Sequence, residues 1–428
     1  MPRVSTVFAV LVPLVAIFLV FRTFDVTARL QLSWPLALHP DNEADADGDG
    51  AQVYLGTPDA PVEHVHVEHH HSASPHVETH DALLDEFSRT IVAVGDLHGD
   101  LPNARKVLHM AGVVDEKGRW SGNVDFFVQT GDIIDRGDDT IKLYHWMDRL
   151  RDEAKAKGGQ VLSHLGNHEW MNVIGDWRYV RPSEIETFGS PAARQQALMT
   201  GQIGKTWAAN YTVTSRLPYH PSLGDPNTDY DALSVAGSSV LSHAAMSFVH
   251  GGLAPDYPDL EPFPSRINEI GRSLLRKLQH RTPPAPHPPN PYPGLPNDAT
   301  HEEHRLYGTD GPLWYRGWAL DSEERVCKAV DDVLRRTGTR RMVMGHTPDF
   351  EKIVSRCDGK IIIIDTGISH AYGGVLSALS VKYTLTPIPK YASSPHGQRW
   401  IEREVVTAVY ADYDEILAVS EQELEGAF

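Results

Sequence analysis

The sequence predicts an α/β domain in which helices cover β-sheets. Short apolar runs rich in Val, Ile and Phe recur from Thr90 onward. Most of them end in Gly-Asp, Gly-Asn or Gly-His, and stretches with helical periodicity lie between them. Runs of this kind are typical of buried strands, and strands that alternate with helices are typical of an α/β fold.

Composition allows a large folded domain and argues against one class of partner. The chain has 428 residues, of which 41% are hydrophobic and 22% are charged, as in ordinary globular proteins. A formal net charge of −18 disfavours nucleic-acid binding, which depends on Lys and Arg at the phosphates. Two cysteines, Cys327 and Cys357, cannot build a disulfide framework, and whether they pair is left open, as is the oligomeric state.

The N-terminus predicts a membrane segment. Val4–Phe21 is an uncharged run of 18 residues between Arg3 and Arg22, which is long enough to cross a bilayer. We expect residues 1–24 to be a signal anchor that holds the chain in a membrane of the secretory pathway. The alternative is a signal peptide whose cleavage would leave a secreted protein. The orientation in the membrane stays open.

Residues 25–88 are expected to form a disordered tether. Residues 41–50 hold five acidic side chains and residues 64–80 hold seven histidines. Low hydrophobicity with clustered charge disfavours a packed core. A histidine tract could bind transition metals, but a solvated linker is the preferred interpretation.

The folded domain is expected over residues 89–412. The predicted strands are Ile91–Val94, Val124–Val128, Val161–Leu165, Ser247–Val249, Met342–Met344 and Ile361–Ile364. One helix is expected to begin near Asp100, with Pro102 in its first turn, and another to run from about Asp139 to Lys157, before two glycines.

Two later segments break this alternation. Residues 283–296 contain eight prolines and are expected to form a polyproline-type surface insertion that acts as a spacer rather than as a ligand for aromatic-lined domains. After Gly374 the pattern predicts strands through Tyr410. An acidic helical tail is expected to follow, within residues 413–428.

Five motifs rich in Asp, His and Gly follow predicted strands. They are Gly95–Gly99 (GDLHG), Gly131–Gly137 (GDIIDRG), Gly166–Glu169 (GNHE), His250–Gly252 (HGG) and Gly345–His346. The carboxyl ends of strands in an α/β sheet face a common crevice, so we expect these motifs to meet there.

The side chains in these motifs suit a pair of metal ions. Aspartate and histidine bind Zn, Fe or Mn, and two neighbouring ions need a bridging carboxylate. Asp132 is the candidate bridge. The candidate ligands are Asp96, His98, Asp132, Asn167, His250 and His346. A water between two such ions becomes a hydroxide near neutral pH and can attack phosphorus.

Three further side chains could complete a phosphate-ester chemistry. His168 could give a proton to the leaving group if a carboxylate orients it, and both Asp135 and Glu169 are available for that role. Arg136 could hold the phosphate oxygens through a two-pronged contact.

At these residues the sequence resembles the calcineurin-like metallophosphoesterases, and within them the phosphoprotein phosphatase superfamily. The segments Gly166–Tyr179, Gly345–Pro348 and Asp365–Gly367 look most like the Shewanella-like phosphatases. The resemblance covers roughly residues 89–385. The Ser-Ala-Pro-Asn-Tyr segment of the large Ser/Thr phosphatases is missing, so surfaces built around it should not be assumed here.

The resemblance implies a two-sheet β-sandwich flanked by helices that carries a metal-binding site. Manganese is one of the candidate metal ions. It implies that Asp96, His98 and Asp132 bind one ion and that Asp132, Asn167, His250 and His346 bind the other. It also implies that His168 is the general acid, oriented by Asp135. Arg136 and a second arginine would bind phosphate, and Arg316 is our choice for the second.

The resulting expectation is a metal-dependent phosphatase that acts on phosphoproteins at Ser, Thr or Tyr. A small-molecule phosphoesterase, such as a hydrolase of dinucleoside polyphosphates, is the main alternative, because the metal site alone cannot distinguish the two classes of substrate. A membrane-tethered binding module without activity is a third possibility. The complete ligand set and the presence of His168 argue against it.

Overall fold

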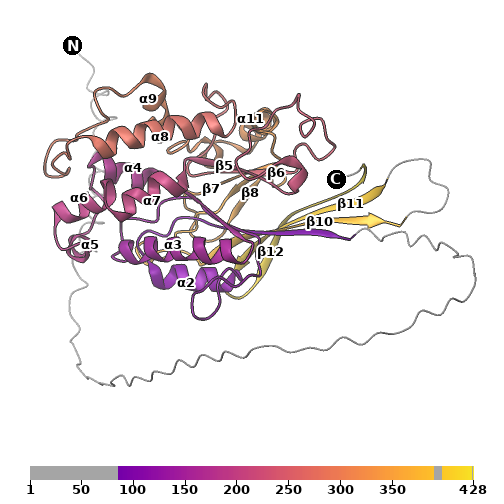
Figure 1. Ribbon diagram of the computed structural model, residues 1–428, viewed down its shortest axis with the longest axis horizontal. Coiled ribbons are helices and arrows are strands. Elements are labelled where there is room, and N and C mark those ends of the chain that lie inside the picture. Colours follow the sequence, from indigo (N-terminus) through magenta and orange to yellow (C-terminus); the bar gives the residue numbers. More distant parts are fainter. Residues whose placement is uncertain (1–84, 390–397, 427) are drawn as a thin grey trace, which may run out of the picture. The chain divides into compact units, whose positions relative to one another are not determined.

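The computed structural model describes residues 85–389, 398–426 and 428, which belong to one compact unit spanning residues 78–428 (Figure 1). The predicted membrane segment Val4–Phe21 and nearly all of the predicted tether lie outside the described residues. Within the described ranges, no helix is both long and apolar enough to cross a bilayer.

Strands and helices alternate along most of this unit. The strands are β1 (Phe87–Val94), β2 (Phe126–Gln129), β3 (Gln160–His164), β4 (Tyr211–Thr212), β5 (Thr214–Pro218), β6 (Ala245–Val249), β7 (Arg341–Met344), β8 (Val354–Arg356), β9 (Ile361–Ile363), β10 (Ser377–Ile388), β11 (Arg399–Tyr410) and β12 (Asp414–Glu425). The helices are α2 (Leu101–Met110), α3 (Thr140–Ala156), α4 (Asn167–Ile174), α5 (Pro182–Thr187), α6 (Pro191–Met199), α7 (Gln202–Asn210), the 3-10 turn η2 (Pro221–Leu223), α8 (Ser265–His280), α9 (His301–Tyr307), α10 (Gly317–Leu320) and α11 (Glu323–Thr337).

The strands form two sheets, which confirms the predicted α/β sandwich. One sheet has seven strands in the order β12-β11-β10-β1-β2-β3-β4, and the other has five in the order β5-β6-β7-β9-β8. Strands β1 to β4 are parallel to one another, and so are β6, β7 and β9. Parallel neighbours place their carboxyl ends at the same edge of a sheet.

Side-chain alternation along the strands creates two apolar layers. In β1, Ile91 and Ala93 belong to the cluster that also holds Phe248 and Val343 of the second sheet. The intervening Val92 and Val94 belong to the cluster that contains the apolar side chains of α2, α3, α8 and α11. Because successive strand residues point to opposite faces, each sheet packs on its partner with one face and on helices with the other (Figure 1).

The two predicted helix starts are confirmed. Helix α2 begins after Asp100, whose Oδ1 accepts a hydrogen bond from the Asn103 backbone at 3.0 Å. Helix α3 begins after Asp139 and ends before Lys157. The Asp100 side chain thus satisfies an amide that the first turn of α2 leaves without a partner, whereas Asp139 makes no such hydrogen bond to α3.

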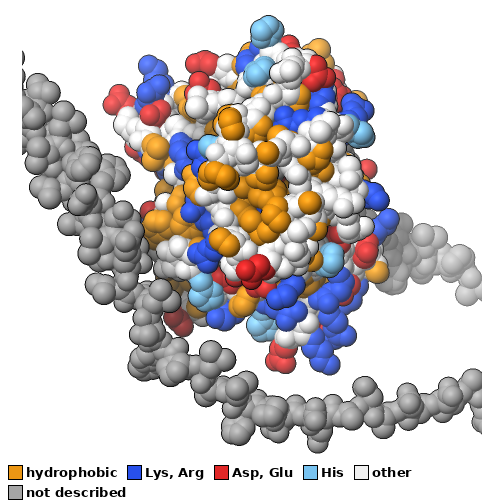
Figure 2. Space-filling model, turned by 90° about the vertical axis from the view of Figure 1, so that its left-hand side faces the viewer, with side chains coloured by type: hydrophobic (Ala, Val, Ile, Leu, Met, Phe, Trp, Pro, Cys, Tyr) orange, Lys and Arg blue, Asp and Glu red, His pale blue; other side chains and the backbone are white. Residues whose placement is uncertain are grey.

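The proline-rich insertion lacks helix and strand over its described residues, but hydrogen bonds tie it to other parts of the domain. The Trp177 amide donates to the His287 carbonyl at 2.6 Å, and the His287 amide donates to the Gly175 carbonyl at 2.8 Å. Gln195 donates to the Pro284 carbonyl at 2.7 Å. These bonds fasten the segment to the loop after α4 and to helix α6. Whether it also acts as a spacer stays a prediction. Figure 2 views the side on which α5 and α6 lie in Figure 1 and shows apolar side chains gathered within a charged rim.

The expected helical tail is a strand instead. β12 pairs with β11 in antiparallel register, and Arg399 and Arg403 of β11 form ion pairs with Glu423 and Glu421. Glu, Ala and Leu favour helix in isolation, but the edge of β11 offers partners to eleven of the twelve residues of β12. Pairing with a neighbouring strand therefore overrides the local preference.

The two cysteines form a disulfide. Cys327 of α11 is joined to Cys357 in the turn between β8 and β9, at a separation of 30 residues. The bond fastens a helix to the edge of the five-stranded sheet.

Candidate active site

The predicted site residues come from the loops that follow the carboxyl ends of parallel strands. Asp96 and His98 follow β1, Asp132 follows β2, and Asn167 and His168 begin α4 directly after β3. In the other sheet, His250 follows β6 and His346 follows β7. The sheet edges thus bring together side chains that lie up to 250 residues apart in the sequence.

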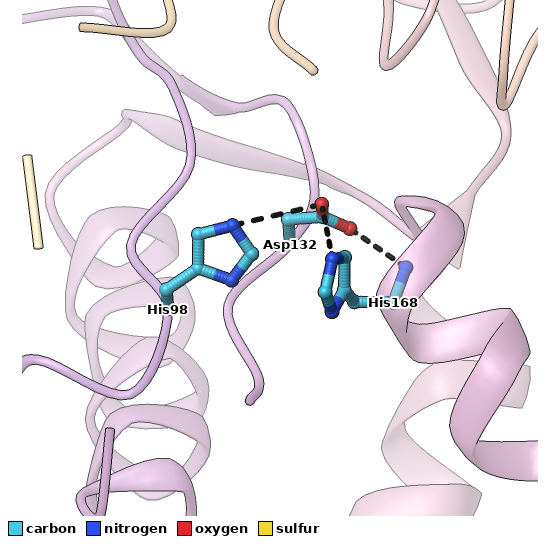
Figure 3. Close-up of side chains that lie close together, drawn as sticks. All are labelled: His98, Asp132 and His168. Carbon is cyan, nitrogen blue, oxygen red and sulfur yellow. Dashed lines mark hydrogen bonds and ion pairs between the residues drawn. The ribbon is translucent and has the colours of Figure 1, made fainter. Parts of the chain in front are cut away.

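Asp132 lies at the centre of the cluster and is 2% exposed. Its Oδ2 is 3.8 Å from His98 Nε2, 3.8 Å from His168 Nε2 and 3.3 Å from His250 Nε2. Figure 3 shows the imidazoles of His98 and His168 on either side of this carboxylate. A carboxylate in contact with groups on both sides suits the bridging position between two ions.

The remaining candidate ligands surround the same point. Ligand atoms of Asp132, His250 and His346 all lie within 4.8 Å of one another. Asn167 Oδ1 is 2.8 Å from His250 Nε2, and Asp96 Oδ2 is 3.9 Å from His98 Nε2. All six predicted ligands are therefore gathered at one place.

Backbone carbonyls orient the imidazoles. His98 Nδ1 lies 3.0 Å from the Ile134 oxygen and His250 Nδ1 lies 3.0 Å from the Thr130 oxygen, so each Nε2 faces the cluster. His346 Nε2 is buried and has no hydrogen-bond partner. Burial lowers the pKa of His98 to about 3, which keeps the ring in its neutral, ligating form. This donor set fits divalent cations.

The carboxylates are crowded in a way that a cation would relieve. Burial, together with the charges of Asp365 and Asp132, raises the pKa of Asp96 well above its usual range. Asp365 follows β9, is 4% exposed, and has a pKa that burial raises to about 6. Sequence reasoning did not include Asp365 in the site, although it ends a predicted strand like the other site residues.

Two glycines let the backbone approach the cluster. A Cβ at Gly166 would lie 2.2 Å from Asp132 Oδ1, and one at Gly345 would lie 2.4 Å from Asp96 Oδ1. No real side chain fits at such distances, so these positions need glycine to bring the loops together.

The two carboxylates near His168 have different roles. Asp135 Oδ2 is 2.7 Å from His168 Nδ1. Glu169 instead accepts the backbone amides of Asp132, Ile133 and Gly166 at 2.7–2.9 Å, and the Tyr144 hydroxyl at 2.8 Å.

Asp135 therefore orients the imidazole, whereas Glu169 fixes the loop that carries Asp132. Burial disfavours the charged form of His168, but Asp132 and Asp135 outweigh it and raise the pKa of this histidine. Its Nε2 lies 3.8 Å from Asp132 Oδ2, on the side of the ring that faces the ligand cluster.

Both candidate phosphate-binding arginines lie at the site. The Arg136 guanidinium lies 4.3 Å from the Tyr179 ring centre and 4.8 Å from that of Tyr372, and its Nε is buried without a hydrogen-bond partner among the described residues. Arg316 donates to the His346 carbonyl at 2.8 Å and to Thr347 Oγ1 at 3.0 Å. Tyr372 was missed from sequence because no motif marks the loop that carries it.

Comparison with known proteins gives a consistent result. The profile of the calcineurin-like phosphoesterase family matches residues 89–350, which is more than half of the chain. An uncharacterized protein of Schizosaccharomyces pombe is 36% identical over 301 residues, which cover 69% of this chain and 78% of that protein. Shewanella-like protein phosphatase 2 of Arabidopsis thaliana is 28% identical over 326 residues, which cover 66% and 72% of the two chains.

A solved structure shares the fold. The cold-active protein-tyrosine phosphatase of a psychrophilic Shewanella species aligns with a TM-score of 0.52 at 20% identity, over 77% of this chain and 80% of that one. An identity this low bears on the fold alone.

Proposed function

This chain belongs to the calcineurin-like phosphoesterases, which are hydrolases of phosphoric esters, and from that premise we propose that it removes phosphate from phosphorylated proteins. The observation that carries the proposal is the Arg136 guanidinium, which lies against the rings of Tyr179 and Tyr372, beside His168 and the ligand cluster. A phosphate bound there would have its leaving group next to an oriented proton donor.

The six clustered side chains would hold two ions. Asp96, His98 and Asp132 would bind one, and Asp132, Asn167, His250 and His346 would bind the other. When bound, the ions supply positive charge to the phosphate and an activated water as the nucleophile. Mn, Fe and Zn all suit this mixture of carboxylate, amide and imidazole donors.

The protein's own side chains then handle the phosphate and the proton. Arg136 and Arg316 hold the phosphate oxygens through charge-assisted hydrogen bonds. His168 gives the proton on Nε2 to the leaving-group oxygen as the P–O bond breaks, while Asp135 holds the ring through Nδ1.

Two considerations favour a phosphoprotein over a dinucleoside polyphosphate. The Arabidopsis relative is named a protein phosphatase. The aromatic residues Tyr179 and Phe350, near Arg136 and Tyr372, are 36% and 48% exposed, which supports an open site able to receive a side chain from a protein surface.

The test is phosphate release by residues 78–428, loaded in parallel with Mn, Fe or Zn. The substrates are phosphoserine, phosphothreonine and phosphotyrosine peptides and a dinucleoside tetraphosphate, with Asp132→Asn as the blank. We expect peptide turnover to exceed dinucleotide turnover. Faster cleavage of the dinucleotide would indicate a phosphoesterase of small molecules. No phosphate release from any of the four substrates, with metals bound, would favour a binding module.

A further inference from the structure

The carboxylate that orients His168 is itself held from a second direction. Asn172 Nδ2 donates to both oxygens of Asp135 at 2.9 Å and to the His168 carbonyl at 2.8 Å. Arg194 Nη2 donates to Asp135 Oδ1 at 3.3 Å from helix α6, 59 residues further along the chain. Asp135 thus has partners on each of its oxygens.

Arg194 is fixed by contacts of its own. Its Nη1 donates to Asn172 Oδ1 at 2.6 Å and its Nη2 donates to Glu184 Oε1 at 2.9 Å. The guanidinium lies 4.7 Å from the centre of the Trp177 ring, and Trp177 is tied to the proline-rich segment. Arg194, Asp135 and Glu184 are each 0% exposed.

The low stability gained from such a buried group of charges points to a role in fixing geometry. Buried ion pairs add little stability over apolar side chains of similar size, because removing the charges from water offsets their attraction. Asp135 also has a φ of 70°, a conformation that residues other than glycine rarely adopt and that recurs at functional sites. The fixed fork of a guanidinium can hold a carboxylate and an amide at once.

We propose that Arg194 is a positioning residue for the phosphatase reaction: with Asn172 it locks the Asp135 carboxylate, so that Asp135 aims His168 Nε2 at the leaving-group oxygen. The inference rests on the proposed function of the site. In the step it serves, the attacking water, as hydroxide, forms a new bond to phosphorus as the P–O bond to the leaving group breaks. The electron pair of the broken bond stays on the leaving oxygen, which takes the proton from His168 Nε2, so the products are an alcohol and inorganic phosphate.

A positioning role predicts dependence on the leaving group. An alkoxide such as the serine side chain leaves only when it is protonated, whereas a dinitrophenolate leaves as the anion. Loss of the His168 alignment should therefore slow the hydrolysis of phosphoserine and leave the hydrolysis rate of dinitrophenyl phosphate nearly unchanged. A loss of folded protein or of bound metal would slow both substrates alike.

The informative variant is Arg194→Met combined with Glu184→Gln in residues 78–428, because removing Arg194 alone would leave Glu184 as a buried, unpaired carboxylate. Glu184→Gln alone is the matched control, since glutamine keeps the Oε1 acceptor for Arg194 and Thr140. Arg194→Lys, which keeps the charge but loses the fork, is the third variant.

For the double variant we expect kcat on a phosphoserine peptide to fall by about 10- to 100-fold, while KM and metal content stay unchanged. The turnover of dinitrophenyl phosphate should stay within about threefold of the wild-type value. Glu184→Gln should keep the wild-type ratio of phosphoserine to dinitrophenyl phosphate turnover. For Arg194→Lys this ratio should lie between those of the wild type and the double variant. Equal losses on both substrates, or no loss on either, would overturn the proposal.

A measurement without substrate separates this inference from the proposed function. In the zinc-loaded chain, the His168 Nδ1 proton shared with Asp135 should give a low-field NMR resonance that survives in Glu184→Gln and shifts or broadens in the double variant. An unchanged resonance would refute the role of Arg194. A wild-type chain inactive on both esters would refute the phosphatase proposal, while the resonance still decides on Arg194.

Discussion

At the scale of single residues, the site is marked by backbone strain. Among the described residues, eight side chains other than glycine have a positive φ, and five of them belong to the site: His98, Asp132, Asp135, Arg136 and His346. Each such conformation costs free energy and persists only where surrounding contacts impose it. The hydrogen bonds that Glu169 accepts from the backbone amides of Asp132 and Ile133 show how that constraint is built.

Asp132→Asn should abolish most of the activity. The change keeps the shape of the side chain but removes the charge that faces three imidazoles. We expect turnover of a phosphopeptide to fall by more than about 100-fold, a loss that exceeds the one expected from removing a group that only orients a ligand. Metal analysis should show weaker binding, and wild-type turnover in this variant would exclude Asp132 as the bridge.

His168→Ala should separate proton transfer from metal binding. We expect kcat to fall by about 10²- to 10⁴-fold, the usual contribution of a general acid, while both metals stay bound. Stopped-flow turnover and metal analysis on the same sample measure the two effects. The exposed His280→Ala serves as the control for losing an imidazole. Loss of metal from the His168 variant would instead make this side chain a ligand, as its position near His98 and Asp132 allows.

At the scale of elements, cross-links fix the periphery of the catalytic domain. The disulfide between Cys327 and Cys357 joins α11 to the turn after β8, and Glu323 accepts the Cys357 amide at 2.8 Å. The side chain of Arg356 also donates to the Trp318 carbonyl, close to the loop that carries Arg316. The disulfide therefore fastens an edge of the fold next to the segment for which we propose phosphate binding.

Replacing both cysteines by serine should lower the free energy of unfolding. A cross-link that closes a loop of 30 residues restricts the unfolded chain, which is typically worth about 2–4 kcal/mol. Thermal unfolding with and without a reductant measures this loss of stability. The reductant should not change the melting temperature of the variant that lacks both cysteines. An equal melting temperature for both proteins in oxidising buffer would mean that the bond adds no stability.

At the scale of the whole molecule, the metal cluster should contribute to stability. Buried carboxylates of Asp96, Asp132 and Asp365 lie close together, and cations between them would relieve the repulsion. A ligand present at 100 times its dissociation constant stabilises a fold by about 2.7 kcal/mol. A chelator should therefore lower the melting temperature, and the shift should shrink in Asp132→Asn. A chelator without effect on the wild type would argue against bound metals.

We also propose that residues 1–24 anchor the chain in a membrane of the secretory pathway. The apolar run Val4–Phe21 supports it, and so does the disulfide, since such bonds persist in oxidising compartments. The full-length chain should stay with membranes after alkaline extraction, and a chain without residues 1–24 should not. Recovery of a secreted form that lacks these residues would instead establish a cleaved signal peptide.

The sequence by itself determined the central strands, the starts of α2 and α3, and the set of motifs that the structure gathers around Asp132. These signals are local: each motif directly follows an apolar run, and parallel strands must bring their ends together. The tertiary structure alone decided the pairing of β12, the attachment of the proline-rich segment, the disulfide, and the contact of Arg194 with Asp135. Those depend on partners far away in the sequence, and helix α6 carries no periodic or motif signal that separates a buried guanidinium from a solvated one. Only packing, which gives each buried polar group its partner, could distinguish them.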